Sequence, residues 1–231
     1  IDSNDVRRGK PAAPRQFGIA DTLVTGDFLF SRAFQVCGRF EAKVVDWAAE
    51  ACVDLTEGEI MQGRFRRNPS VTEADYQEII ARKTATLFAV GTRIAAHLCG
   101  FSPERVEEMA RCGREIGMAF QMIDDVLDIE GDPARTGKRV GTDLLDGNPS
   151  LPIVRGLGIP AVRKAFLEEG ADAQLVDEAI AGIRGAGILD AVREDAVVHA
   201  RRAAQLVATL PASAHRDGVH ELISTLVARE L

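Results

Sequence analysis

Apolar residues recur along most of this chain at the three- and four-residue spacing of amphipathic helices. No stretch of useful length alternates apolar and polar residues as a half-buried strand would. The pattern therefore predicts an all-α protein. We expect helices over the segments 19–39, 42–66, 72–98, 103–130, 151–157, 160–169, 171–184, 188–210 and 217–229.

Residues that start and stop helices support several of these boundaries. Ser102 followed by Pro103 forms an N-cap with proline at the first helical position, and Thr72 forms a second cap before acidic residues. An Asn-Pro-Ser sequence at 68–70 separates two helices. No segment is polar or long enough to divide the chain, and no internal repeat is visible. We therefore expect one domain over residues 1–231.

Composition narrows the function further. The chain has 231 residues, of which 46% are hydrophobic and 27% charged, and its formal net charge is −7. That negative charge argues against nonspecific nucleic-acid binding, which needs clustered cationic surface. The longest apolar runs are far shorter than the roughly 20 residues of a membrane-spanning helix. The four cysteines form no C-x-x-C pair, so we expect reduced thiols in a cytoplasmic protein. The four histidines show no metal-ligand spacing, so we expect no metal site built on them.

Three aspartates interrupt an apolar helical run at Asp124, Asp125 and Asp128. Asp124 and Asp128 are four residues apart, so they share a helix face, with Gln121 one turn below them. Unpaired carboxylates are costly to bury, so this face needs a bound cation if it lines a cavity. Oxygen ligands without His or Cys nearby favour a hard cation, Mg²⁺ shared with a phosphate-bearing substrate. The alternative is an acidic stripe on a solvated helix face.

A basic loop punctuated by glycines follows this helix. Residues 136–143 read Thr-Gly-Lys-Arg-Val-Gly-Thr-Asp, which places Lys138 and Arg139 shortly after the aspartates. Cations beside a metal site suit a diphosphate, because its charge needs positive groups from several directions.

With this loop, an ordered series of motifs resembles the trans-isoprenyl diphosphate synthase (polyprenyl synthetase) family. The series covers the chain from its first residue to about Pro152: residues 2–11 (DSNDVRRGKP), 26–33 (GDFLFSRA), 57–62 (EGEIMQ), 83–85 (KTA), 121–128 (QMIDDVLD), 137–138 (GK) and 141–144 (GTDL). The resemblance implies a single-domain, isoprenoid-synthase-type helical bundle around a central cavity. It implies a Mg²⁺-dependent prenyltransferase that condenses isopentenyl diphosphate with an allylic diphosphate into a linear trans-polyprenyl diphosphate.

The resemblance also implies roles for individual residues. Asp124 would ligate Mg²⁺, with Asp125 and Asp128 as further ligands or supporting groups, and Asp2 would bind ions from the opposite wall. The diphosphates would be held by Lys83, Lys138 and Arg7 on the allylic side and by Arg8 on the isopentenyl side. Polar contacts near the reacting carbons would come from Thr84 and Gln121, while Asp143 would steady the Lys138 loop or a metal-bound water. The released pyrophosphate would take the final proton, so no side-chain base is expected. The family is also expected to form homodimers.

The sequence departs from the family pattern at two places. It begins inside the first aspartate-rich motif, so we expect residues 1–231 to lack the start of that motif and the helices before it. Asn148 stands where the family often has a lysine, which puts one diphosphate contact in doubt. Phe28, Phe30, Phe34 and Phe88 are expected in the core or along a hydrocarbon tunnel, with core packing favoured.

Two other functions remain open from the sequence. A class I terpene cyclase would share the fold and the ionisation of a diphosphate, although the pair Arg7 and Arg8 and Lys83 favour chain elongation. A noncatalytic subunit of a heteromeric prenyl synthase would not need intact Asp124, Asp125, Asp128 and Lys138. The sequence does not predict the product length.

Overall fold

A computed structural model describes residues 6–7, 10–131 and 140–228, with side chains for the latter two ranges. It confirms the all-α prediction, apart from a short antiparallel pairing of β1 (Val6–Arg7) with β2 (Lys10–Pro11), in which Arg7 lies opposite Lys10. No helix in these described ranges is long and apolar enough to cross a membrane.

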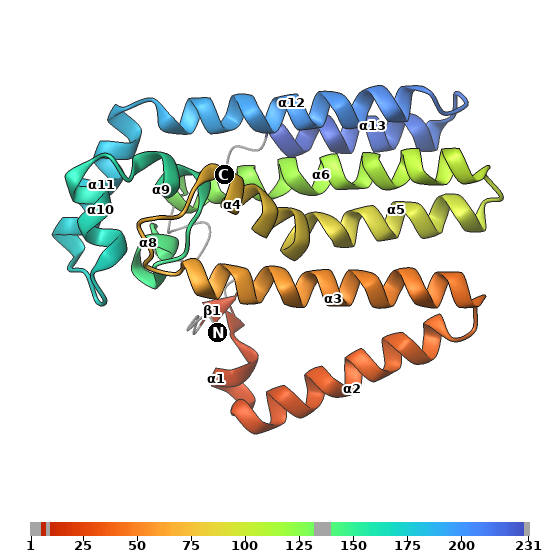
Figure 1. The fold of residues 1–231 in the computed structure, drawn as a ribbon, viewed down its shortest axis with the longest axis horizontal. Helices are drawn as coiled ribbons and strands as arrows, with labels where there is room; N and C mark the ends of the chain where they lie inside the picture. The colour runs from red at the N-terminus through yellow and green to blue at the C-terminus, as the bar shows by residue number, and fades with distance from the viewer. Residues whose placement is uncertain (1–5, 8–9, 132–139, 229–231) are drawn as a thin grey trace.

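The long helices lie in layers around α6 (Pro103–Glu130). On one side of α6 lie α12 (Ile188–Ala208) and α13 (Ala214–Val227), and on the other side lie α5 (Thr86–Leu98) and then α3 (Ala42–Phe65) (Figure 1). The outermost helix is α2 (Ile19–Cys37), which follows the short α1 (Ala13–Phe17) and approaches α3 toward its C-terminal end (Figure 1).

Four helices, three of them short, gather at the C-terminal end of α6, the end that carries the three aspartates (Figure 1). They are α8 (Thr142–Asp146), α9 (Leu151–Gly156), α10 (Pro160–Leu167) and α11 (Ala173–Gly185). Neither α8 nor the short α1 was predicted, because five residues are too few to show a helical period.

The predicted helix 72–98 differs most from the observed structure. It consists of α4 (Glu73–Ile80), a π-helical segment η1 (Ala81–Ala85) and α5. The predicted caps are confirmed. The Thr72 side chain accepts from the Asp75 amide while Asp75 accepts from the Thr72 amide, a complete capping box, and the Ser102 side chain accepts from the Arg105 amide.

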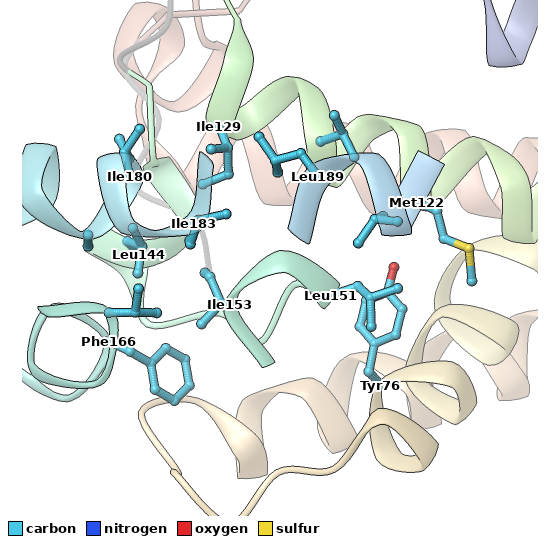
Figure 2. Close-up of a cluster of buried hydrophobic side chains, with 14 of the residues drawn as sticks. Tyr76, Met122, Ile129, Leu144, Leu151, Ile153, Phe166, Ile180, Ile183 and Leu189 are labelled. Atoms are coloured by element: carbon cyan, nitrogen blue, oxygen red, sulfur yellow. The ribbon is translucent and has the colours of Figure 1, made fainter. Parts of the chain in front are cut away.

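Two hydrophobic clusters lie along α6. The proximal cluster, near the aspartates, includes Tyr76, Met122, Ile123, Val126, Leu151, Ile153 and Phe166. Figure 2 shows Tyr76 beside Leu151 at one side of this cluster and Phe166 at the other. The distal cluster includes Trp47, Val106, Met109, Cys112, Ala119, Ala203 and Val207. Because the proximal cluster packs α4, α6, α9, α10 and α11 together, it holds the elements around the aspartates in place.

Candidate functional site

A cavity of about 370 Å³ opens at the aspartate end of α6. It is bounded by α3, α4, η1, α6 and the segment from α8 to the start of α9. Polar side chains dominate its lining, namely Gln62, Tyr76, Lys83, Thr84, Gln121, Asp124, Asp125, Asp128, Thr142, Asp143, Asp146, Asn148 and Ser150. Seven of the candidate residues named from the sequence are therefore brought together in one place: Lys83, Thr84, Gln121, Asp124, Asp125, Asp128 and Asp143.

Asp124 and Asp128 lie on the cavity face of α6 because they are one helical turn apart. Asp124 is exposed and Asp128 is half-buried. The two carboxylate oxygens of Asp128 accept the amides of Thr142 at 3.2 Å and Asp143 at 3.1 Å. The backbone carbonyl of Asp128 accepts the amide of Gly141, whose φ of +75° suits glycine. Asp128 thus fixes the first turn of α8 against α6.

Asp125 faces a different environment. Its side chain is buried, accepting the side-chain amide of Gln121 at 2.9 Å and the backbone amide of Leu151 at 3.1 Å. Burial raises the pKa of Asp125 to about 7, opposed by these hydrogen bonds and assisted by the charge of Asp124. Because each carboxylate oxygen already accepts a protein donor, Asp125 ties α6 to the start of α9.

Asp143, on α8, supplies a fourth carboxylate. Burial raises its pKa well above the usual range, and the charges of Asp128 and Asp125 add to this effect. Its side chain accepts from the amide of Asn148 at 3.5 Å. The negative charges of these carboxylates repel one another around the cavity, and a bound cation would relieve that repulsion.

The four carboxylates at the cavity suit a hard divalent cation, because such a cation prefers oxygen ligands. Within the described ranges, however, no three His, Cys, Asp or Glu side chains lie close enough together to hold a metal ion by themselves. Asp2, the remaining predicted ligand, is outside those ranges. The residues described therefore fit a cation that takes further oxygens from elsewhere, such as a bound phosphate.

The π-helical segment η1 carries the two candidate residues opposite α6. The ammonium of Lys83 lies 2.7 Å from a carboxylate oxygen of Glu59 and also donates to the side chain of Gln62. The hydroxyl of Thr84 donates to the side-chain oxygen of Gln121 at 2.9 Å. Gln121 in turn donates to Asp125, so a continuous chain of hydrogen bonds joins η1 to α6.

Other predicted site residues are placed only in part. Arg7 belongs to β1, and nothing is described of its side chain. Asp2, Arg8 and Lys138 lie outside the described residues. Asn148, at the position where the family often has lysine, lines the cavity.

The prediction that the phenylalanines are core residues is wrong for two of them. Phe28 and Phe30 on α2 are 62% and 56% exposed, and α2 has no buried residue in the described structure. Phe34 stacks on Phe30 with ring centroids 5.0 Å apart, while Phe88 packs on Phe120 at 5.5 Å.

Sequence reasoning missed Tyr76, which is 1% exposed and lines the cavity. Burial raises its pKa well above the usual range, and the negative charge of Asp125 adds to this. A signal was present, because Tyr76, Ile79, Ile80 and Lys83 follow the helical spacing of one face, and all four line the cavity.

The fold of the chain matches those of solved prenyl diphosphate synthases. It matches the crystal structure of a polyprenyl synthase from Caulobacter crescentus, complexed with calcium and isoprenyl diphosphate, with a TM-score of 0.94 and 32% identity, covering 100% of this chain and 72% of that one. It also matches heptaprenyl diphosphate synthase from Staphylococcus aureus with a TM-score of 0.93 and 28% identity, covering 100% of this chain and 74% of that one.

The polyprenyl synthetase family model matches residues 1–181, and the chain belongs to that family. It is 34% identical to octaprenyl diphosphate synthase of Escherichia coli, over 100% of this chain and 73% of that protein. It is 29% identical to geranylgeranyl diphosphate synthase of Methanosarcina mazei, over 100% of this chain and 73% of that protein. The chain is accordingly a trans-prenyltransferase, and neither the cyclase nor the noncatalytic subunit is favoured. The products named for these relatives differ in length, so they leave this chain's product length undecided.

Proposed function

We propose that this prenyltransferase uses Mg²⁺, held by Asp124 and Asp128, to ionise an allylic diphosphate and join it to isopentenyl diphosphate. The observation that carries the proposal is the meeting of Asp124, Asp128 and Asp143 with Lys83 around one cavity. Carboxylates alone would repel one another there, and a lysine alone would bind any anion. Together they suit a metal-bound diphosphate, which carries charge of both signs.

The metal would supply electrostatic stabilisation of the charge that develops on the leaving diphosphate. Asp124 and Asp128 face the cavity and would be ligands, with Asp2 contributing as the resemblance implies. Asp125, which is buried and accepts from Gln121 and Leu151, would act by holding this end of α6 in place. The calcium in the Caulobacter crescentus structure supports a divalent cation in this fold.

The basic residues would grip the two diphosphates. Lys83 reaches the cavity from η1, and we assign it, with Lys138 and Arg7, to the allylic diphosphate. Arg8 would bind isopentenyl diphosphate. Lys83 is paired with Glu59 and Gln62, and a bound diphosphate would compete with those two partners for its ammonium.

Thr84 and Gln121 would line the place where the new bond forms, since their hydrogen bond spans η1 and α6 at the cavity wall. Asp143 would steady the Lys138 loop or hold a metal-bound water. No side chain is assigned as the base that takes the final proton, because the departing pyrophosphate can accept it.

We also propose that two copies of the chain form a homodimer through α2. The described part of α2 exposes many large apolar side chains, namely Ile19, Leu23, Val24, Phe28, Leu29, Phe30 and Val36. A contiguous exposed apolar surface marks a protein contact more often than a free surface.

The four cysteines are free thiols, which supports the proposal of a cytoplasmic location.

The test is turnover of radiolabelled isopentenyl diphosphate with allylic primers by the full-length protein. Replacing Asp124 and Asp128 together by alanine should reduce turnover at least ~100-fold, on the scale of losing electrostatic stabilisation of a leaving group. Asp177→Ala is the matched control, because Asp177 is an exposed carboxylate of α11 away from the cavity. Linear products at the normal rate from the double variant would refute the metal site.

A further inference from the structure

The π-helical segment that carries Lys83 and Thr84 lies against helices on both sides. It contacts α3 on one side and α6 on the other, in the region where the chain of α4, η1 and α5 runs between them (Figure 1). A π-helix is rare and is less favourable than an α-helix, so its presence at these five residues calls for a tertiary cause.

Glycines lie at both contacts. Gly58 of α3 is buried, and a β-carbon built on it would lie 2.5 Å from the backbone nitrogen of Lys83 and 3.0 Å from its α-carbon. Gly117 of α6 is also buried, and a β-carbon there would lie 2.5 Å from the α-carbon of Ala85. These are backbone atoms, which cannot rotate away as the end of a long side chain can.

The contact at Gly58 is reinforced by charge. Arg82, the residue before Lys83, forms ion pairs with Asp54 at 3.3 Å and with Glu57 at 2.5 Å, both on α3. Glu57 is the neighbour of Gly58 in the sequence. These ion pairs hold the α3 backbone at Gly58 against η1 at Lys83, whose side chain lines the cavity.

We propose that Gly58 is a positioning residue of the active site, which sets where Lys83 meets the diphosphate by letting the α3 backbone touch the π-helical turn. This inference rests on the proposed function of Lys83. It predicts that Gly58→Ala displaces η1 and weakens the grip of Lys83, although Gly58 itself contacts no substrate. A displacement near 1 Å at such a contact is enough to lower activity by orders of magnitude.

The experiment is a double-mutant cycle in the full-length enzyme between Gly58→Ala and Lys83→Met. The KM for the allylic diphosphate, kcat and the midpoint of thermal unfolding are measured for each variant. Gly63→Ala is the matched control, because Gly63 lies on the same helix and a β-carbon there would meet no atom within 4 Å. Gly58→Ala should raise the KM about tenfold with Lys83 present and leave it unchanged with methionine at position 83, while Gly63→Ala changes neither.

Two outcomes would overturn the inference. One is a KM for Gly58→Ala equal to that for Gly63→Ala, and the other is the same rise in KM with and without Lys83, which would indicate a purely structural role. A Lys83→Met variant with an unchanged KM would instead refute the proposed role of Lys83 itself. If Gly58→Ala does not fold, Arg82→Ala replaces it in the same cycle, since it loosens the α3–η1 contact without adding volume. The same two outcomes decide the result.

Discussion

Asp125→Asn should change how the stability of the metal-free protein depends on pH. Asp125 is buried, and its pKa is about 7 in the folded protein against an ordinary value of 3.8. The folded state therefore binds a proton at Asp125 more tightly than the unfolded chain does. The stability that this proton contributes is fully present below pH 3.8 and is lost as the pH rises through about 7. Asparagine cannot titrate, so the variant lacks this loss.

The size of the effect follows from the two pKa values. Between pH 5 and pH 8 the wild-type protein should lose about 3 kcal/mol more stability than Asp125→Asn, since one pKa unit is worth about 1.4 kcal/mol. For a chain of this size that corresponds to roughly 5–10 °C in the unfolding midpoint. Asp124 and Asp143 are present in both proteins, but their charges interact with Asp125, so the difference between the two curves reports Asp125 together with its effect on these neighbours.

The assay is thermal or urea unfolding in the presence of a chelator, at half-unit steps from pH 5 to pH 8. Asp177→Asn is the control, because that carboxylate is exposed on α11 and should follow the wild-type curve. Parallel stability curves for Asp125→Asn and the wild type over this range would refute the reasoning, because they would mean that Asp125 does not carry a raised pKa.

Four further predictions concern the site, a cap, the core and the proposed dimer. Lys83→Met should raise the KM for the allylic diphosphate at least ~10-fold with a smaller change in KM for isopentenyl diphosphate, measured by steady-state kinetics; equal changes in both would contradict the assignment. Thr72→Ala removes the capping box and should cost about 1 kcal/mol in urea unfolding, whereas Thr225→Ala, at an exposed threonine of α13, serves as its control. Phe166→Ala should cost about 3–5 kcal/mol, because the ring is fully buried in the proximal cluster. Phe28→Glu should shift sedimentation from dimer to monomer, and an unchanged sedimentation coefficient would exclude α2 from the interface.

Hydrophobic period and helix punctuation were enough to predict the long helices. The segment 103–130 is α6 over the same residues, since Ser102 and Pro103 mark its start and Gly131 follows its last residue. Thr72 predicted the start of α4 for the same reason. These signals are local, so a single sequence contains them.

Features that depend on contacts between distant segments were not predictable in this way. The π-helix at residues 81–85 lies against Gly58 and Gly117, which approach from two other helices and which no local pattern connects to it. The burial of Asp125 depends on Leu151, 26 residues later in the chain. Spacing alone placed Asp124, Asp125 and Asp128 on one helix, but it could not show that Asp125 is buried, Asp128 half-buried and Asp124 exposed.

The helix α6 contributes side chains to both hydrophobic clusters, Met122 and Val126 to the proximal one and Val106 and Cys112 to the distal one. Melting of one cluster should therefore destabilise the other, because both are held together through this helix. Occupation of the cavity would for the same reason slow hydrogen exchange of amides near Cys112, several helical turns away, with no change in their contacts.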